Sequence, residues 1–385
     1  MPDGSAPVLR FVVPEGLGYA SGGTMYNSHV AEALRSLGVT VNVVGVPGAW
    51  PVGSAADRRR LAAALDPAHD AILVDGLLAL GAPGEIRAAA RRSLPMTARG
   101  SSQDAAPSTG SRVGPAVGIL VHMSLADAPG LTAPEAARFA ALDRESLAVA
   151  DTVLVPSDFS ARRLAERYGT SARVARPGVV RVPVASGSIS QGGAPHLLCL
   201  AALLPGKGQR RLVRALGALR GVPWTLTLAG HDAADSAYAR ILADEAARLG
   251  IGDRVLMPGE LRGARLEEEW GRADLTVLAS ESETFGLVVT ESIARGVPAL
   301  VAAGTGATEA LGLSLAGGLG PAGTVAGAPG RGTDPLTVEL GRWLADPALR
   351  ARWRAAALGA RPLLPGWEAT ARAVAHAMGL RVPRP

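Results

Sequence analysis

The sequence predicts an α/β protein of two domains, each with a parallel β-sheet covered by helices. The chain has 385 residues, about twice the usual length of one domain. In both halves a short β-branched run is followed by a glycine-containing turn and an amphipathic helix, which is typical of βα units on a parallel sheet. With 48% hydrophobic and 19% charged residues, the composition is that of a globular protein.

The first half contains five predicted strands and three predicted helices. A β-branched strand over residues 8–13 leads through the turn GLGYASGGT into a helix over 25–37, which ends at Gly38. The remaining predicted strands are 41–46, 71–74, 117–122 and 152–155, and the remaining predicted helices are 55–65 and 134–149. The strands are short and apolar, as expected for a buried parallel sheet.

The second half repeats this plan. Its predicted strands are 197–202, 224–229, 255–257, 275–279 and 299–301, and its predicted helices lie near 208–219, 236–249, 264–271 and 286–295. The repetition favours a second domain of the same type as the first.

Residues 1–182 and 196–365 are expected to form the two domains. The Gly/Ser-rich stretch PVASGSISQGGAP, residues 183–195, has the composition of a linker between two lobes that move relative to each other. The final stretch, 366–385, is expected to contain a closing helix that packs back on the first domain. The apolar residues at helical spacing in this stretch are Trp367, Ala371, Val374 and Ala375.

Two further stretches are interpreted as loops. Residues 97–114 are rich in Ser, Gly and Ala and are expected to form a mobile surface loop. The uncharged stretch 310–330 is long enough to span a bilayer, but its many Gly and Pro residues favour a loop instead. No transmembrane segment is therefore expected.

Composition excludes several other classes of protein. The single cysteine, Cys199, excludes an internal disulfide and a cysteine-based zinc site. The net charge of +5 is spread along the chain and only 4% of residues are aromatic, so nucleic acid is not an expected partner. Charged residues interrupt the N-terminal apolar segment, which does not resemble a secretory signal. A cytoplasmic location is expected.

The glycine-rich turn after the first strand is a candidate nucleotide contact. Gly16, Gly18 and Ser21 approach the dinucleotide-binding pattern, but the second strand, in VNVVGVPG, does not end in the acidic residue that would hold a ribose. A tight turn and a nicotinamide site are about equally compatible with this stretch alone. Gly22 and Gly23 precede the helix and would let its backbone N–H groups approach a phosphate.

Lys207 is the second candidate. Of the 39 basic residues, 38 are Arg and one is this lysine, which stands in the turn LLPGKGQRR after a predicted strand. The turn lacks the spacing of a Walker loop. A phosphate contact at the mouth of a parallel sheet and a solvated turn lysine remain the two interpretations of these residues.

The segment ASESETFGLVVTESIARGVPALVA, residues 279–302, carries the most specific pattern. A predicted strand ends near Ala279, and Thr284 is expected to cap a helix whose N-terminus faces the carboxyl end of the sheet, where anions bind. Glu283 lies in the turn, and Glu291 is expected about two turns into the helix beside an apolar face. Carboxylates accept hydrogen bonds from sugar hydroxyls, so the site suits a nucleotide joined to a sugar.

With these motifs the chain resembles the GT-B glycosyltransferases of family 4, the glycosyl transferases group 1, of the actinobacterial type. The hallmark of that family is a pair of glutamates separated by seven residues, within S-x-x-E-x-F-G followed by a helix and G-V-P. The matching residues are Ser280, Glu283, Phe285, Gly286, Glu291, Gly296, Val297 and Pro298, together with PGKG at 205–208, RPGV at 176–179 and SGG at 21–23. His122 stands where the family has a histidine facing the donor sugar.

The resemblance implies two Rossmann-like domains that face each other across a cleft, with the acceptor on the N-terminal side and the nucleotide sugar on the C-terminal side. It implies a hexosyltransferase that moves a hexose from a nucleotide diphosphate sugar to a small-molecule acceptor, with retention at the anomeric carbon. The implied catalytic residues are His122 and Glu283, and the implied donor-binding residues are Gly22, Gly23, Lys207, Phe285, Gly286, Leu287 and Glu291. In this scheme Glu291 holds the ribose and Lys207 contacts the diphosphate.

Neither a metal nor a cofactor is expected. No D-x-D triplet is present to hold a divalent ion on a diphosphate. Ala202 stands where many family members carry an arginine, which leaves Lys207 as the only recognisable side-chain cation for the diphosphate. The alternatives are a GT-B nucleotide-sugar epimerase, a non-catalytic nucleotide-sugar-binding protein and an NAD-binding Rossmann oxidoreductase. The missing acidic residue and the second βα half argue against the oxidoreductase.

Overall fold

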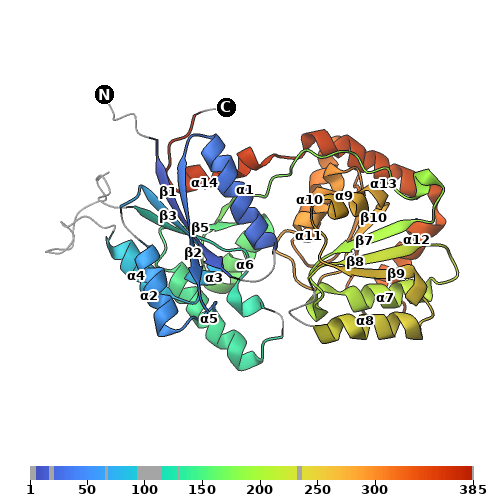
Figure 1. The fold of residues 1–385 in the computed structure, drawn as a ribbon, viewed down its shortest axis with the longest axis horizontal. Helices are drawn as coiled ribbons and strands as arrows, with labels where there is room; N and C mark the ends of the chain where they lie inside the picture. The colour runs from blue at the N-terminus through green and yellow to red at the C-terminus, as the bar shows by residue number, and fades with distance from the viewer. Residues whose placement is uncertain are drawn as a thin grey trace. The chain divides into compact units, whose positions relative to one another are not determined.

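The computed structural model describes residues 6–16, 21–65, 68–92, 115–128, 130–231 and 236–383. The chain forms two compact units, Met1–Gly178 together with Trp367–Pro385, and Val179–Gly366 (Figure 1). The stretch 97–114, expected to be a surface loop, lies outside the described residues.

The first unit contains a six-stranded parallel sheet in the order β2-β1-β3-β4-β5-β6. Its strands are β1 (Val8–Glu15), β2 (Thr40–Pro47), β3 (Ala71–Asp75), β4 (Ala116–Leu120), β5 (Thr152–Val155) and β6 (Arg173–Val174). Its helices are α1 (Gly22–Ser36), α2 (Ala55–Ala64), α3 (Gly76–Ala79), α4 (Pro83–Arg92), α5 (Ala133–Leu147), α6 (Asp158–Tyr168) and α14 (Trp367–Ala377).

Both faces of this sheet are buried under helices. Successive side chains of a strand point to opposite faces, so each strand contributes to two core clusters. In β3, Ile72 and Val74 pack into a core cluster with residues of α2, α4, α5 and α6. Ala71 and Leu73, on the other face, pack with residues of α1 and α14. Helix α14, red in Figure 1, therefore belongs to the same core as α1, although the two helices are at opposite ends of the chain.

The second unit contains another six-stranded parallel sheet, in the order β12-β11-β10-β7-β8-β9. Its strands are β7 (His196–Leu200), β8 (Thr225–Ala229), β9 (Val255–Gly259), β10 (Leu275–Leu278), β11 (Ala299–Ala302) and β12 (Gly323–Ala326). Its helices are α7 (Gln209–Ala218), α8 (Ser236–Arg248), α9 (Gly263–Arg272), α10 (Leu287–Ala294), α11 (Ala307–Gly312), α12 (Pro335–Ala345) and α13 (Pro347–Ala360).

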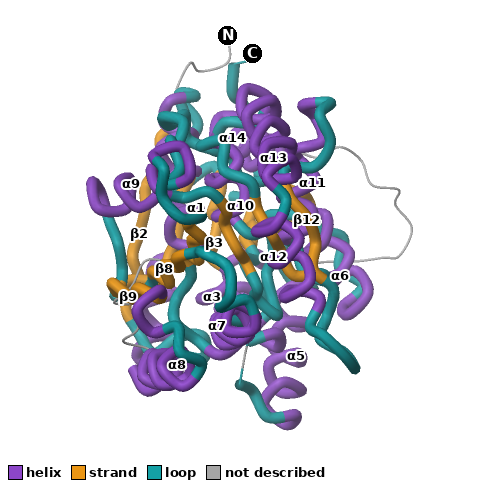
Figure 2. Tube along the Cα trace, turned by 90° about the vertical axis from the view of Figure 1, so that its right-hand side faces the viewer, coloured by secondary structure: helices purple, strands orange, loops and turns teal. Residues whose placement is uncertain are grey.

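Helices cover both faces of this second sheet as well. Leu197, Cys199 and Val277 pack with residues of α7, α8 and α12 in one core cluster. On the other face Leu198 packs against Trp270 of α9, and Leu278 packs with residues of α10, α11 and α13. In Figure 2 the strands, drawn in orange, run between helices drawn in purple.

Two parts of the second unit differ from the expectation. The stretch 310–330, expected to be a loop, includes the edge strand β12, in which Gly323 lies so close to β11 that a Cβ would be 1.7 Å from the carbonyl oxygen of Ala299. The stretch 183–195, expected to be a linker, lies within the second unit. Backbone N–H groups of Ala185 and Gly187 donate hydrogen bonds of 2.9 Å to carbonyl groups at the ends of α10 and α9.

In the part of the chain that the structure describes, no helix combines the length and apolar character needed to cross a bilayer.

Candidate functional site

Each sheet has a topological switch point, where successive connections leave in opposite directions. In the second unit it lies between β7 and β10, because the chain runs from β7 to β8 on one side and returns to β10 on the other. In the first unit it lies between β1 and β3. Open α/β sheets bind ligands outside the carboxyl ends of their strands at such a point. The loops after these strands contain candidate site residues, and His122 follows the neighbouring strand β4.

The turn after β7 presents Lys207. A short 3₁₀ segment, Pro205–Lys207, is followed by Gly208, which has a φ of 73° and precedes α7. A Cβ on Gly208 would lie 2.1 Å from the carbonyl oxygen of Ala279, so only glycine allows the turn to pack on the backbone after β10. The N–H of Glu281 also donates a 2.9 Å hydrogen bond to the carbonyl of Gly206. The two loops that flank the switch point are thus held together.

The loop after β10 leads into α10 through Gly286. This residue is the N-cap with a φ of 85°, and a Cβ on it would lie 3.1 Å from Ala307. The buried ring of Phe285, which is 2% exposed, packs in the core with Leu278 and anchors the loop. The prediction that Thr284 caps this helix was wrong. The helix begins at Leu287 without a side-chain cap, because the glycine backbone makes the turn instead.

Lys207 and Glu283 meet at this point. The ammonium nitrogen of Lys207 donates a 2.7 Å hydrogen bond to Oε1 of Glu283, and the side chains are 31% and 17% exposed. A lysine ammonium has three N–H donors, and this bond uses one of them. The pair therefore combines a cation with further donors and a carboxylate that accepts hydrogen bonds.

Glu291 occupies a different environment. It is the fifth residue of α10, about one turn from the helix start and not the expected two. It lies beside the buried Arg295, whose guanidinium stacks over the Trp270 ring at 4.7 Å and donates a 2.6 Å bond to Glu267. Burial raises the pKa of Glu291, while the nearby Arg295 charge acts in the opposite direction. No hydrogen bond among the described residues joins Glu291 to Lys207 or Glu283.

The first unit brings its predicted residues together at the start of α1. The helix begins at Gly22, earlier than the predicted 25, with Ser21 as N-cap in a capping box with Thr24. A Cβ on Gly23 would lie 3.0 Å from Cδ2 of His122, so this glycine makes room for the imidazole. The other glycine of the expected fingerprint, Gly18, lies outside the described residues.

His122 follows β4 and is held by two polar residues that the sequence analysis did not identify. Its Nε2 lies 2.9 Å from Oδ1 of Asn27 and 3.5 Å from Oδ2 of Asp75. Asn27 in turn donates a 2.6 Å hydrogen bond from Nδ2 to Asp75. Burial lowers the pKa of His122, and the Asp75 charge opposes that effect. Asp75 ends the apolar strand AILVD, which is the one signal in the sequence that could have indicated it.

The loop after His122 is held in place by hydrogen bonds to the buried carboxyl group of Asp143. Ser124 donates a 2.5 Å hydrogen bond to Asp143, which is 0% exposed, and Tyr168 donates a 2.9 Å bond to the same oxygen. Burial raises the pKa of Asp143. This cluster joins the loop to α5 and α6 and so supports the position of His122.

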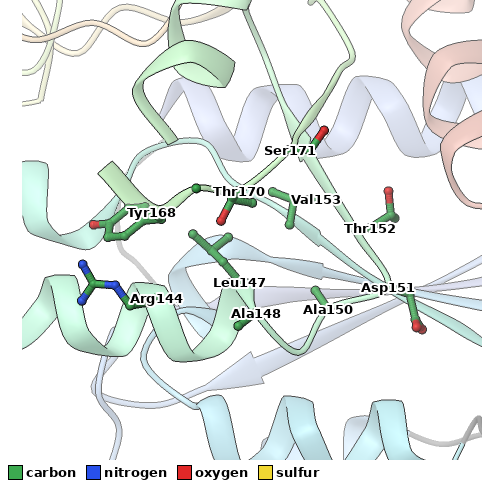
Figure 3. Close-up of a pocket in the computed structure, with 11 residues that line it drawn as sticks. Arg144, Leu147, Ala148, Ala150, Asp151, Thr152, Val153, Tyr168, Thr170 and Ser171 are labelled. Atoms are coloured by element: carbon green, nitrogen blue, oxygen red, sulfur yellow. The ribbon is translucent and has the colours of Figure 1, made fainter. Parts of the chain in front are cut away.

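A pocket of about 310 Å³ lies elsewhere in the first unit (Figure 3). It is formed by the end of α5, the beginning of β5 and the residues after α6, and the side chains of Arg144 and Tyr168 lie at one side of it. It is at the amino end of β5, whereas His122 follows the carboxyl end of β4. None of the predicted site residues lines it.

Comparison with known proteins finds a family match within the second unit. Residues 187–357 match the family model described as Glycosyl transferases group 1. The matched range includes Glu283, predicted to be catalytic, and Lys207 and Glu291, predicted to bind the donor.

Two relatives carry names that describe sugar transfer. A D-inositol 3-phosphate glycosyltransferase of Acidothermus cellulolyticus is 32% identical over 244 residues, which cover 57% of this chain and 54% of that protein. A GDP-mannose-dependent alpha-(1-6)-phosphatidylinositol monomannoside mannosyltransferase of Mycolicibacterium smegmatis is 31% identical over 230 residues, which cover 54% of this chain and 56% of that protein. The chain thus spans a little over half the length of these relatives.

Solved structures match nearly the whole chain. A sucrose-phosphate synthase from Thermosynechococcus elongatus has a TM-score of 0.70 at 18% identity, covering 96% of this chain and 98% of that one. The Anabaena protein HepE in complex with UDP-glucose has a TM-score of 0.69 at 16% identity, covering 96% and 99%. At these identities the likeness concerns the fold, and it confirms the predicted GT-B class with two Rossmann-like sheets.

Proposed function

We propose that this protein is a metal-independent hexosyltransferase that moves a hexose from a nucleotide diphosphate sugar to a small-molecule acceptor, with retention at the anomeric carbon. The family match of the second unit and the names of the relatives support the reaction class. The UDP-glucose complex of HepE, which shares the fold, supports a nucleotide sugar as donor.

The observation that carries the proposal is the position of Lys207 beside Glu283 at the switch point between β7 and β10. Negative charge grows on the diphosphate as the bond between its oxygen and the anomeric carbon breaks. The ammonium of Lys207 and the uncapped N–H groups at the start of α10 would stabilise that charge. These groups supply the positive charge that a divalent ion supplies in other transferases, which is why we propose a metal-independent reaction.

The remaining roles follow from the donor and acceptor properties of each side chain. The carboxylate of Glu283 would accept a hydrogen bond from a hydroxyl of the transferred sugar, and Glu291 would accept from the ribose. In the first unit, His122 would contact the transferred sugar. The backbone N–H groups of Gly22 and Gly23 at the start of α1 would contact a phosphate of the donor.

A donor and acceptor panel tests the proposal. The full chain is incubated with UDP- and GDP-linked hexoses in the presence of EDTA, with and without candidate acceptors, and the released nucleoside diphosphate and the sugar products are measured. Inositol 3-phosphate belongs in the acceptor panel because relatives are named for it. We expect nucleotide release that depends on an acceptor and persists in EDTA, with an α-linked product from an α-linked donor.

Two outcomes would contradict the proposal. Conversion of the donor into another nucleotide sugar without an acceptor would indicate an epimerase. Binding of nucleotide sugars without turnover on any acceptor of a broad panel would indicate a binding protein.

A further inference from the structure

A buried chain of three polar side chains leads to the imidazole of His122. Asp75 is the last residue of β3, Asn27 lies in the second turn of α1, and His122 follows β4. Asp75 and Asn27 are only 4% and 6% exposed, whereas the His122 side chain is 21% exposed. Two buried residues, Asp75 and Asn27, thus adjoin the partly exposed His122.

The hydrogen bonds of this chain have a defined direction. A carboxylate only accepts, and Asp75 accepts at both oxygens: Oδ1 from the N–H of Leu77 at 2.8 Å and Oδ2 from Nδ2 of Asn27 at 2.6 Å. The amide nitrogen of Asn27 therefore faces Asp75, and its carbonyl oxygen faces His122. Because an amide oxygen also only accepts, the Nε2 of His122, 2.9 Å away, must carry a proton.

We propose that Asp75 and Asn27 are positioning residues that hold a proton on Nε2 of His122 and thereby present its Nδ1 as a hydrogen-bond acceptor. The inference deepens the proposed function and rests on it in one respect, namely that the group facing Nδ1 is a hydroxyl of the transferred sugar. No hydrogen bond from the described residues reaches Nδ1, so this nitrogen is available to a ligand.

The surroundings of the ring oppose its reorientation. Tyr26 packs against the imidazole in a T-shaped arrangement, with ring centroids 5.1 Å apart and planes inclined at 72°. Tyr26 is itself fixed by a 2.7 Å hydrogen bond from its hydroxyl to the carbonyl of Ala175. On another side Gly23 stands close to Cδ2 and Nε2. A ring turned by 180° about its Cβ–Cγ bond would put Cε1 in the place of Nε2 and would lose the hydrogen bond to Asn27.

The near-isosteric change Asp75→Asn is expected to move the ring proton of His122 from Nε2 to Nδ1. The asparagine oxygen is expected to keep accepting from the N–H of Leu77, since asparagine caps helices as well as aspartate does. Its NH₂ group then faces Asn27, which must turn its own oxygen toward residue 75 and its NH₂ toward His122. Nε2 must then accept, and the proton moves to Nδ1. A purely structural role for Asp75 predicts no such inversion.

Nitrogen NMR of ¹⁵N-histidine-labelled full chain measures the tautomer directly. The signals of His122 are identified by their loss in His122→Gln. Asp346→Asn is the matched control, because Asp346 also caps a helix, through a 3.0 Å bond from the N–H of Leu349, but lies in the second unit. Thermal melts establish that each variant is folded.

The expected result is a neutral His122 protonated at Nε2 in the wild type and in Asp346→Asn, and protonated at Nδ1 in Asp75→Asn. Asp75→Ala removes the carboxylate that orients the amide of Asn27, so it should give a mixture of both tautomers, and it keeps the proposal testable if Asp75→Asn does not fold. A wild-type His122 protonated at Nδ1 would overturn the proposal. So would a folded Asp75→Asn variant, or a folded Asp75→Ala variant, with the wild-type tautomer alone.

The transfer assay adds a readout that separates this inference from the proposed function. Asp75→Asn should lower kcat for hexose transfer roughly tenfold or more relative to Asp346→Asn, with unchanged affinity for the bare nucleoside diphosphate. If the tautomer inverts as expected but the wild type transfers no hexose, the proposed function is wrong, and the positioning role of Asp75 and Asn27 is supported. If the wild type transfers hexose and Asp75→Asn keeps the wild-type tautomer, the positioning role is wrong, and the proposed function is supported.

Discussion

The two units carry polar residues at the same kind of topological position, but they pair them differently. In the first unit Asp75, Asn27 and His122 form a closed chain in which the buried members bond mainly to each other. In the second unit Lys207 and Glu283 form a partly exposed ion pair in which the ammonium retains further donors. The N-terminus of α10 nearby has no side-chain cap.

This difference indicates a division of roles. A satisfied buried network sets the orientation and protonation of one side chain, which in the first unit is His122. Uncapped N–H groups and a cation with spare donors attract an anion, as the second unit requires for a diphosphate. The following predictions test whether substitutions in the two units separate in this way.

The largest effect is expected at Lys207. Lys207→Ala should lower turnover on the order of a hundredfold, about 3 kcal/mol of transition-state stabilisation, because charge on the diphosphate grows as the glycosidic bond breaks. Lys207→Arg should also fail, since the turn packs backbone against backbone at Gly208 and a planar guanidinium cannot reproduce the compact ammonium. Steady-state kinetics measure both. Near-normal turnover of Lys207→Ala would remove the phosphate role, and near-normal turnover of Lys207→Arg would make the lone lysine an accident of composition.

Glu283→Gln should lower turnover by roughly tenfold to a hundredfold, because it removes a charged hydrogen-bond acceptor for the sugar. Affinity for a bare nucleoside diphosphate should not fall, since Lys207 keeps its charge. Glu281→Gln is the matched control, because Glu281 is an exposed residue of the same loop. Equal losses in the two variants would show that the loop, and not the Glu283 carboxylate, matters.

Glu291→Gln should weaken nucleotide binding by about tenfold and slightly stabilise the fold. Burial raises the folded-state pKa of Glu291, so the wild-type protein loses stability as pH rises from below the unfolded pKa through the folded pKa. The variant should therefore melt about 2 °C higher than the wild type at neutral pH and at the same temperature as the wild type at acidic pH. Calorimetry and melts at several pH values measure these effects. Unchanged nucleotide affinity would refute the ribose assignment.

The smallest effect concerns the scaffold behind Lys207. Glu245 of α8 accepts hydrogen bonds from Arg214, Arg248 and Arg210, which lower its pKa to about 2. Its contribution to stability is therefore present above the unfolded pKa near 4.3 and is lost as pH falls toward 2.

Glu245→Gln should therefore destabilise the protein by about 1 kcal/mol at neutral pH and less as the solution is acidified. Nucleotide affinity should be unchanged. A melting difference that persists undiminished at low pH would show that packing, not charge, is responsible.

Much of the fold follows from the sequence, because short apolar strands, glycine turns and amphipathic helices each leave a local pattern. The strand β12 was missed since its sequence, GTVA among glycines and prolines, lacks a continuous apolar run. The stretch 183–195 has the composition of a linker, yet backbone hydrogen bonds, which no composition reveals, hold it to the second unit.

Some residues of the candidate site could likewise be predicted from the sequence, and others could not. Glu283 and Lys207 stand in local motifs, and the structure brings them together because β7 and β10 are neighbours in the sheet. Asn27 and Asp75 were not predicted, since their relation to His122 arises from three elements far apart in the chain. A single buried asparagine on a helix carries no local signal of such a role.

The most direct test of the division of roles is calorimetric binding of a bare nucleoside diphosphate to the wild type, Lys207→Ala and His122→Ala. The first unit is expected to act on the sugar and the second on the nucleotide. We therefore expect affinity to fall by roughly tenfold or more in Lys207→Ala and to remain at the wild-type level in His122→Ala, which should nevertheless lose transfer activity. Equal loss of nucleotide affinity in both folded variants would contradict the account.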